Sequence, residues 1–563
     1  MPLDTSPRAR VGVITHGSLG QGVEMKLDPA RSVESVRAGT FVVVEGETFD
    51  FFSLITDLRI DAANEGILLR PPGADDELLR RVLQGSGTYA TVSLRPQLMV
   101  PQGIDDEAPL PVKTVPAHFS AVGEASDDDV ARVFGAEAND GGDRYFNVGT
   151  PLGMDTPVCL DLARFVERSN AVFGKTGTGK SFLTRLLLAG TIATGRAVSL
   201  VFDMHNEYGE RARRETDGDT AAFVPGLRDL FKSKVQVFSL DPESTRRRGG
   251  AADVEVHLYA DQVEPADVLP LRETLNLNAT ATESTYALQK KHGRRWLATL
   301  LRADPAEIEA MAEETGTHPG SLSALRRKLD RLDGLPFFHT EPQTGRQDAI
   351  DALFQTLDEG RSVVLEFGRY NSLLVYLLVA NVITRRLRDR YEAKMETYER
   401  TQAEADKPQQ LLITVEEAHN FLGPETARET PFGKIAREMR KFFVSLLIVD
   451  QRPSGIDEEV LSQIGTKLVA QLNDEKDIAA ALVGSPGAGG LRQILASLDS
   501  KQQALLLGHA VPMPITIRTR DYGDELFAAV RAKAGRGGLQ TGGSGAGGAE
   551  TAAELQETMG TLF

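Results

Sequence analysis

The sequence contains almost no cysteine and no long apolar run. Its single cysteine, Cys159, excludes an internal disulfide framework and is typical of a reducing compartment. The longest apolar stretch, residues 373–383, is too short to span a bilayer and is followed by Arg385 and Arg386. Residues 1–5 lack the basic and apolar pattern of a secretory signal. We therefore expect a soluble, cytoplasmic protein with no membrane partner.

Positive charge is also in deficit. The 80 acidic residues outnumber the 63 lysines and arginines, which gives a formal net charge of −17. Because phosphate contacts need Lys and Arg, this balance lowers the expectation of a nucleic-acid partner. It does not exclude one, since an acidic outer surface can coexist with a basic groove or channel. The length of 563 residues predicts two or more domains.

Residues 1–110 are expected to form a small all-β barrel or sandwich. Short β-branched or aromatic runs alternate there with Gly, Pro and Asp, a pattern typical of such folds. The runs are residues 11–14, 40–44, 51–55 and 90–94. Residues 111–145 are acidic and weakly apolar, so we expect a connector with a short helix near residues 130–134.

Residues 146–530 alternate between strand and helix patterns, which predicts an α/β core with a parallel sheet covered on both faces. Within this core, residues from about 265 to 335 show only helical spacing, so we expect an inserted helical subdomain. Another helix is expected over residues 373–401. Residues 531–563 are predicted to be a Gly-rich flexible tail with a terminal amphipathic segment at 550–563, which either recruits partners or is simply disordered.

A phosphate-binding loop is the most specific motif. The apolar run at residues 171–173 leads directly into residues 174–181, which satisfy the pattern GxxxxGK[ST], and a helical pattern follows. Glycines let backbone N–H groups surround a phosphate, and the helix N-terminus adds its dipole. The motif predicts ATP and Mg²⁺ as cofactors, with Lys180 on the β- and γ-phosphates and Ser181 on the metal. The expected nucleotide-binding residues are Gly174, Lys175, Thr176, Gly177, Thr178, Gly179, Lys180 and Ser181.

A second strand supplies the acids that hydrolysis requires. The apolar run at residues 411–415 ends in Glu416 and Glu417. In P-loop enzymes the first acid at such a strand end orients the magnesium shell, and the second polarises the attacking water. We therefore assign Glu416 to Mg²⁺ and Glu417 to catalysis, although Asp is more usual than Glu at the first position. The alternative is that both acids only cap the next helix.

Two further strand runs end in polar residues, and such ends meet at one edge of a parallel sheet. Gln451 follows one run and is expected to sense the γ-phosphate. Asp203 and Glu207 follow the other; they either reach the nucleotide, as we expect for Asp203, or form caps and loop hydrogen bonds. A zinc role for His205 and His419 is disfavoured, because no Cys or paired His spacing supports one.

A basic helix is predicted at residues 434–441, between the strand that ends in Glu417 and the strand that precedes Gln451. In ring ATPases a helix in this position can supply an arginine finger to the nucleotide of a neighbouring subunit. Arg437 is the first choice for such a finger and Arg440 the second. The alternative is a basic helix face that is simply solvated.

Together these motifs resemble the HerA branch of the HerA–FtsK ATPases. The segments that carry the resemblance are residues 174–181, 203–208, 416–420 and 450–454. The resemblance covers roughly residues 8–522 and implies a HAS-barrel at the N-terminus, a RecA-like core and a homo-hexameric ring. The family commonly has Ser before the Gln-Arg-Pro sequence, whereas this chain has Asp450.

The resemblance also implies a function that composition and spacing do not supply. HerA proteins are double-stranded DNA translocases that usually work with a NurA-like nuclease in DNA end resection and recombinational repair. An alternative is a HerA-like ring that scaffolds and regulates an effector in antiviral defence. Three basic clusters, at residues 246–248, 290–295 and 326–328, are candidates for solvated surface, and one of the first two could instead contact DNA phosphates in a channel.

Overall fold

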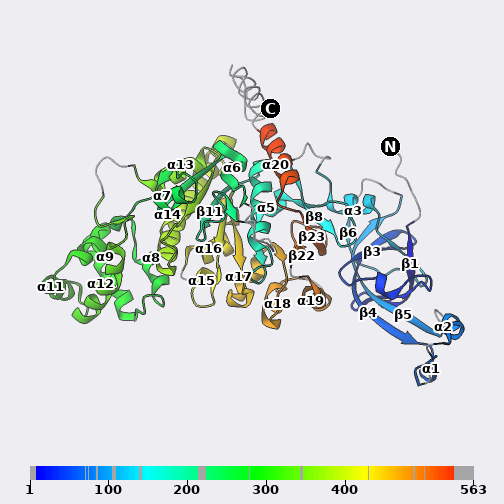
Figure 1. The fold of residues 1–563 in the computed structure, drawn as a ribbon. Helices are drawn as coiled ribbons and strands as arrows, with labels where there is room; N and C mark the ends of the chain where they lie inside the picture. Colours follow the sequence, from blue (N-terminus) through cyan, green and yellow to red (C-terminus); the bar gives the residue numbers. More distant parts are fainter. Residues whose placement is uncertain are drawn as a thin grey trace, which may run out of the picture.

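The computed structural model describes residues 8–69, 71–73, 75–83, 87–103, 109–137, 143–213, 223–277, 279–342, 347–428, 430–485, 488–499 and 501–537. A seven-stranded sheet and a 12-stranded sheet organise this part of the chain. Figure 1 shows the smaller sheet at one end, the larger in the middle and a group of helices at the other end. Among these residues, none of the helices combines the length and apolar character that crossing a bilayer requires.

The N-terminal sheet closes into a barrel. Its hydrogen-bonded order is β2-β1-β7-β3-β4-β5, and β5 pairs with β2 to complete the circle, while β6 (Leu110–Pro111) extends β5. Closure removes the exposed edges of an open sheet. The prediction of a small all-β barrel is therefore confirmed. The six strands of the circle are β1 (Arg10–Ser18), β2 (Gly22–Leu27), β3 (Phe41–Glu45), β4 (Phe49–Ala62), β5 (Thr88–Pro101) and β7 (Ala121–Glu124).

The barrel reaches further along the chain than the sequence predicts. Strand β7 lies between β1 and β3, although its residues fall in the segment 111–145 that is expected to be a connector. Val122 is buried in the barrel core, so this short strand completes the wall. Its sequence, Ala-Val-Gly-Glu, contains a single β-branched residue and therefore gives a weak strand signal. The helix expected nearby is present as α3 (Asp127–Phe134), and the Ser126 side chain caps its N-terminus.

The large sheet has the order β15-β14-β18-β11-β19-β20-β10-β21-β22-β23-β8-β9. Neighbours from β15 to β21 are parallel, and those from β21 to β9 are antiparallel. The prediction of a RecA-like α/β core is confirmed. The strands are β8 (Tyr145–Pro151), β9 (Val158–Asp161), β10 (Asn170–Phe173), β11 (Val198–Asp203), β14 (Val235–Ser239), β15 (Val254–Glu255), β18 (Ser362–Glu366), β19 (Leu411–Glu416), β20 (Val444–Asp450), β21 (Thr466–Val469), β22 (Gln503–Gly508) and β23 (Ile515–Thr519).

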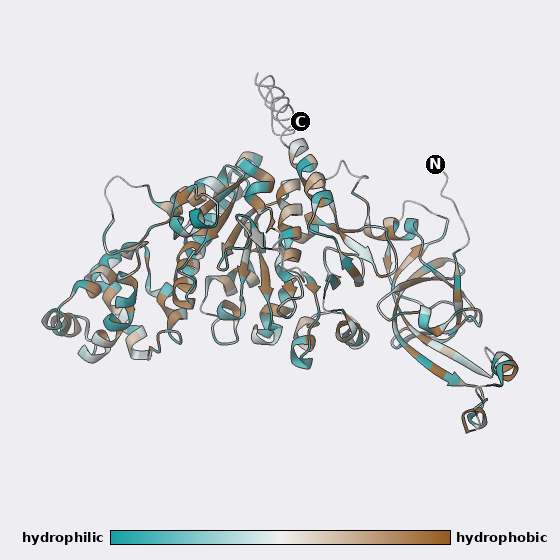
Figure 2. Cartoon of the chain, in the orientation of Figure 1, coloured by the Kyte–Doolittle hydropathy of each residue, from teal (hydrophilic) through white to brown (hydrophobic). Residues whose placement is uncertain are grey.

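Helices cover both faces of this sheet. On one face α5 (Lys180–Thr194), α6 (Leu227–Phe231) and α20 (Asp524–Gly537) pack together. On the other, α16 (Pro431–Glu438) packs against α14 (Leu373–Thr401) and α17 (Glu458–Gln463). Strands covered on both faces read as continuous apolar runs, and Figure 2 shows the central strands as mainly hydrophobic. Helix α20 continues to residue 537, past the expected start of the tail at 531, and the rest of the tail lies outside the described residues.

The expected helical insertion is present. The two-residue strands β16 (Leu258–Tyr259) and β17 (Phe338–His339) pair in parallel and bring the two ends of the insertion together. Trp296 is fully buried inside it and donates its indole N–H to the Val263 carbonyl at 2.9 Å. In Figure 1 these helices lie at the end of the molecule away from the barrel. They are α8 (Pro265–Val268), α9 (Ala279–His292), α10 (Trp296–Arg302), α11 (Pro305–Thr315) and α12 (Pro319–Asp333).

The shorter remaining elements connect these parts. The strands β12 (Ala212–Arg213) and β13 (Phe223–Val224) form a small antiparallel pair. The remaining α-helices are α1 (Glu65–Leu69), α2 (Glu77–Leu83), α4 (Leu162–Glu167), α7 (Pro242–Arg247), α13 (Ala349–Asp358), α15 (His419–Leu422), α18 (Glu475–Ala481) and α19 (Ala488–Ser497).

Arg385 joins the insertion to the core. From α14 its guanidinium donates to both carboxylate oxygens of Asp267, which is fully buried in α8, at 2.9–3.2 Å. It also donates to Glu264 at 3.0 Å and to the Gln262 carbonyl at 2.8 Å. Removing one member of a buried ion pair leaves the other charge without compensation, which is costly. The arginine at the end of the apolar run is therefore a structural anchor.

We expect Arg385→Ala to lower the free energy of unfolding by about 3–5 kcal/mol, because Asp267 would remain buried without its partner. Arg390→Ala is the matched control on the same helix. Arg390 pairs with Asp358, but its side chain is 43% exposed, and such pairs contribute about 0–1 kcal/mol. Thermal and urea unfolding of both variants measure the difference. Equal losses in the two variants would contradict the anchoring role.

Candidate nucleotide-binding site

Neighbouring parallel strands bring the predicted residues to one edge of the sheet. In the sheet, β20 separates β10 from β19, and β11 follows β19. Phe173 lies opposite Asp450, and Glu416 lies opposite Val449, so the three strands end at the same level. The phosphate loop, the two acids after β19 and the residues after β20 therefore meet at the carboxyl ends of the strands, where ligands of open α/β sheets bind.

The phosphate loop has the backbone geometry of an anion site. Gly177 and Gly179 have φ angles of 79° and 88°, in the left-handed region that side chains disfavour. Gly179 is the N-cap of α5, and no side chain caps the helix there. The N–H groups of the first turn and the positive end of the helix dipole therefore remain available for a phosphate.

Lys180 is surrounded by carboxylates. Its ammonium donates to the Lys175 carbonyl at 3.0 Å, so it lies across the loop that it is expected to serve. Burial lowers the pKa of Lys180, and the nearby carboxylates oppose that shift. These carboxylates are Glu417, Asp450, Glu416 and Glu207. Ser181 is partly exposed in the first turn of α5, where its hydroxyl is accessible to a ligand of the loop.

Two tyrosines hold the end of β19. The Tyr208 hydroxyl donates to a carboxylate oxygen of Glu416 at 2.8 Å. The Tyr376 hydroxyl, on α14, donates to the Glu416 carbonyl at 3.0 Å and accepts from its N–H at 3.2 Å. Both tyrosines are fully buried. The first acid after the apolar strand is therefore fixed in position by residues far from it in sequence.

Glu416 has the properties of a metal-shell ligand. Its second carboxylate oxygen is buried and has no hydrogen-bond partner. Burial, and then the charges of Asp203 and Glu207, raise the pKa of Glu416 well above its usual value. Mg²⁺ prefers oxygen ligands and would supply the positive charge that this buried carboxylate lacks. The residues present thus fit Mg²⁺, with Glu416 and Ser181 as the groups that would hold it.

Gln451 connects the phosphate loop to Glu417. Its side-chain amide donates to the Glu417 carboxylate at 2.9 Å, and its oxygen accepts from the Thr176 hydroxyl. Glu417 has a φ of 47°, which is uncommon for a residue other than glycine and often marks a functional position. The structure therefore brings Gln451 and Glu417 together beside the loop, in positions suited to sensing a γ-phosphate and polarising a water.

Asp203 lies at the same edge, but its carboxylate accepts hydrogen bonds from the backbone of the loop that follows it. One carboxylate oxygen accepts from the Glu207 N–H at 2.7 Å, and the other accepts from the N–H groups of Tyr208 and Gly209 at 2.8 and 3.3 Å. The side chain is fully buried. These hydrogen bonds shape the loop after β11, which is the alternative that the sequence left open, and a contact between Asp203 and nucleotide stays a prediction.

The two candidate arginine fingers are not brought to this phosphate loop. Arg440 is exposed in the short 3₁₀ helix Met439–Phe442, which precedes the first residue of β20. The loop follows the last residue of the parallel strand β10, so Arg440 lies at the opposite edge of the sheet. Arg437, in α16, is partly buried and donates to the Ala427 carbonyl at 3.4 Å. A finger role in a neighbouring subunit stays a prediction.

Arg185 is a buried site residue that the motifs do not indicate. From α5 it donates to the Glu207 carbonyl. Its guanidinium lies 5.2–5.9 Å from three aromatic rings, those of Phe182, Tyr208 and Tyr522. Such contacts stabilise a buried cation. The only signal in the sequence is an arginine within an apolar helical run, and it gives no indication of these partners.

The chain is similar to known proteins over most of its length. A family model, the central domain of the helicase HerA, matches residues 146–387. Over 507 residues the chain is 25% identical to the DNA double-strand break repair helicase HerA of Sulfolobus acidocaldarius, covering 88% of this chain and 90% of that one. The chain is therefore similar to HerA helicases over most of its length. It is also 27% identical to the HerA helicase of Pyrococcus furiosus over 74% of each chain.

Similarity to HerA helicases fits the observed architecture. The closed N-terminal barrel corresponds to the expected HAS-barrel, and a P-loop protein of this family is an ATPase. Among solved structures, VirB4 of Thermoanaerobacter pseudethanolicus matches this chain with a TM-score of 0.42 and 15% sequence identity, covering 67% of this chain and 96% of that one. The matched HerA central domain ends before β19, so the roles of Glu417 and Gln451 rest on their geometry.

Glu366 is a further buried acid beside this edge. It is the last residue of β18 and lies opposite Asp203. Its carboxylate accepts from the Thr245 hydroxyl at 2.7 Å and pairs with Arg248. Burial, reinforced by the charge of Asp203, raises the pKa of Glu366 to about 7. Arg248, from the first basic cluster, is thus engaged inside the chain.

We expect Lys180→Ala to abolish ATP hydrolysis and weaken nucleotide binding, because the phosphates lose their cation. Glu417→Gln should retain binding but lose at least about 100-fold in kcat, since an amide cannot polarise the attacking water. Glu425→Gln is the control, because Glu425 is exposed and follows Glu417 closely in the sequence. Phosphate release and titration with a fluorescent ATP analogue measure the two steps. A Glu417→Gln variant that turns over normally would contradict the assignment.

Glu366 predicts a pH dependence of stability. Because its folded-state pKa is raised to about 7, the native state retains this proton longer than the unfolded state. Stability is therefore lost as pH rises from the ordinary Glu pKa of about 4.3 to the raised value. Glu366→Gln should reduce the stability difference between pH 5 and pH 8 by on the order of 3 kcal/mol. Thermal unfolding at both pH values measures this, and an unchanged difference would contradict it.

Proposed function

We propose that this HerA-like ATPase hydrolyses Mg²⁺-ATP to translocate double-stranded DNA as a homo-hexameric ring. The observation that carries the proposal is the chain of contacts from Thr176 through Gln451 to Glu417, which ties the phosphate loop to a carboxylate suited to activate water. The DNA part rests on likeness over most of the chain to relatives named as DNA double-strand break repair helicases.

Each group at the sheet edge has a role in the proposed cycle. Lys180 would bind the β- and γ-phosphates, and Ser181 and Glu416 would hold Mg²⁺, which would supply positive charge to the phosphates. Glu417 orients and polarises the attacking water, and Gln451 senses the γ-phosphate. Gln451 is suited to this role because it contacts both Thr176 and Glu417.

The position of the arginines is consistent with the proposed ring. Neither Arg437 nor Arg440 is brought to the phosphate loop of its own chain, so either can act as a finger only toward a neighbour. A ring places one subunit against the nucleotide site of the next. We propose a NurA-like nuclease as the partner of this ring, acting in DNA end resection and recombinational repair.

The basic cluster at residues 290–295 is the proposed contact to DNA. Arg248 of the first cluster is held by Glu366, and Arg247 pairs with Glu243 at 2.7 Å, which leaves that cluster less suited to phosphate contacts. Lys290 and Arg294 are exposed at the end of α9 and in the turn after it. Contacts of this kind bind the phosphate backbone without reading bases.

We expect linear double-stranded DNA to raise the rate of ATP hydrolysis severalfold, and more at low salt, because phosphate contacts release counterions. The double variant Lys290→Ala/Arg294→Ala should lose much of this stimulation and keep its DNA-independent rate. Steady-state phosphate release, with Glu417→Gln as the blank, measures both. Hydrolysis that does not respond to DNA at low salt would contradict translocation while leaving the ATPase intact.

A further inference from the structure

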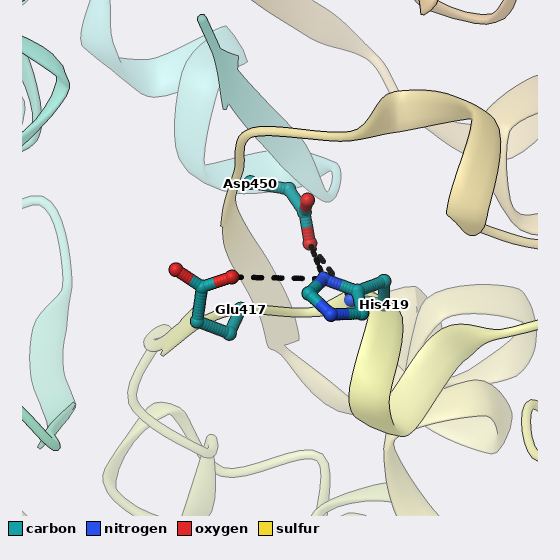
Figure 3. Close-up of side chains that lie close together, drawn as sticks. All are labelled: Glu417, His419 and Asp450. Carbon is teal, nitrogen blue, oxygen red and sulfur yellow. Dashed lines mark hydrogen bonds and ion pairs between the residues drawn. The ribbon is translucent and has the colours of Figure 1, made fainter. Parts of the chain in front are cut away.

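His419 lies next to the proposed catalytic residue Glu417, and Asp450 in turn contacts His419. The Asp450 carboxylate accepts from the backbone N–H of His419 at 2.8 Å and contacts its ring Nδ1 at 3.0 Å. The same ring nitrogen lies 3.7 Å from a carboxylate oxygen of Glu417. Figure 3 shows the imidazole between the two acids. The three residues come from the ends of two adjacent strands, β19 and β20.

Asp450 is a fixed support for the imidazole. Its side chain is fully buried, and its second oxygen accepts from the Arg452 N–H at 2.7 Å. The oxygen facing His419 binds that residue through both the backbone and the ring, which sets the position of the imidazole. The ligand atoms of Glu417, His419 and Asp450 lie within 4.8 Å of one another, a spacing that a metal ion could use. The Asp450 oxygens are, however, already used by N–H groups.

The two carboxylate oxygens of Glu417 have different neighbours, a hydrogen-bond donor at one and an ion-pair partner at the other. Gln451 donates to one oxygen at 2.9 Å, and His419 faces the other. The backbone is held as well, because Asn420 donates to the Glu417 carbonyl through its N–H at 3.0 Å and its side chain at 2.9 Å. Gln451 also contacts Thr176, so a nucleotide in the loop must compete for it. Among the described contacts, His419 makes none with the phosphate loop.

We propose that His419 is a positioning residue for the Glu417 carboxylate and that Asp450 fixes its ring. The inference rests on the proposed catalytic role of Glu417 and deepens it. When Gln451 turns to a γ-phosphate, His419 remains on the other oxygen and keeps the carboxylate aimed at the water. Positioning of this kind matters because a small misplacement of a catalytic group can cost roughly 100-fold in rate.

The charge of His419 strengthens this support. The hydrogen bond to Asp450, and then the charges of Asp450 and Glu417, raise the pKa of His419, against the effects of burial and of Arg452. The charged groups that face the ring are therefore Asp450, Glu417 and Arg452. A cationic imidazole favours the ionised form of a neighbouring carboxylate, which is the form that polarises water. Deprotonation of His419 weakens the support as pH rises.

The test is the pH profile of kcat for ATP hydrolysis between about pH 6 and pH 9, a range that includes the ordinary His pKa of about 6.5. We expect kcat of the unmodified chain to fall as pH rises through the raised pKa of His419. We call this fall of kcat with rising pH the alkaline limb of the profile. His419→Gln should lower kcat roughly 10- to 100-fold, remove the alkaline limb and leave KM for ATP nearly unchanged. Asp450→Asn should shift the limb to lower pH, because the acid that raises the pKa of His419 is gone.

His509→Gln is the matched control. His509 pairs with Glu167 at 3.1 Å, and its side chain is 27% exposed, against 32% for His419. It follows β22, whose last residue lies opposite the first residue of β21, so it is at the edge of the sheet away from the phosphate loop. We expect this variant to keep the kcat and the pH profile of the unmodified chain. Thermal unfolding of each variant shows that the comparison is made on folded protein.

Three outcomes overturn the proposal, and they are distinguishable. If Glu417→Gln abolishes hydrolysis but His419→Gln keeps the alkaline limb, Glu417 remains catalytic and the positioning role of His419 falls. If Glu417→Gln turns over normally, the catalytic assignment falls and the positioning role falls with it. Loss of the limb in His419→Gln, together with its shift in Asp450→Asn, supports the proposal. A uniform loss of kcat in both variants, with the limb unmoved, shows a purely structural role.

Discussion

Buried carboxylates crowd the edge of the sheet where the parallel strands end, and the rest of the site depends on how each one is stabilised. Asp203, Glu366 and Glu416 are fully or nearly fully buried, and burial raises the pKa of all three. Burying an acid without partners is costly. Each acid is stabilised by different partners. Backbone N–H groups bind Asp203, an arginine and a threonine bind Glu366, and a tyrosine binds Glu416. The loops at this edge are shaped by those needs.

This concentration of negative charge also surrounds Lys180 of the phosphate loop. Lys180 is held among four carboxylates, and its ammonium folds back onto the loop carbonyl of Lys175. A nucleotide with its metal would give the lysine and the helix N-terminus a phosphate to bind, and would give the buried oxygen of Glu416 a cation. Helix α14 extends the same system, because Tyr376 holds the end of β19 and Arg385 holds the insertion. These residues are nine apart, about 14 Å along one rigid helix.

The sequence predicts the parts of this site that are contiguous and misses those that are paired over distance. Residues 174–181 carry strand, loop and helix signals in one short stretch, so their fold is readable. The contact between Gln451 and Thr176 spans 275 residues, and the contact between Tyr208 and Glu416 spans 208. Periodicity places each residue at a strand end but cannot decide which side chains meet. For the same reason the sequence places Asp203 at this edge without showing its backbone partners, and the four-residue strand β7 is predicted as a connector.

Asp450 stands where HerA proteins commonly have Ser, and its role becomes clear only from the residue that it contacts. From the sequence, an acid beside Gln451 is a change near the γ-phosphate sensor. In the structure, Asp450 binds His419 through its backbone and ring, while Gln451 contacts both Thr176 and Glu417. A serine at this position could accept a hydrogen bond but would add no charge. The acid therefore leaves the sensor contact intact and acts on the histidine, whose raised pKa favours a cation beside the glutamate that faces the nucleotide site.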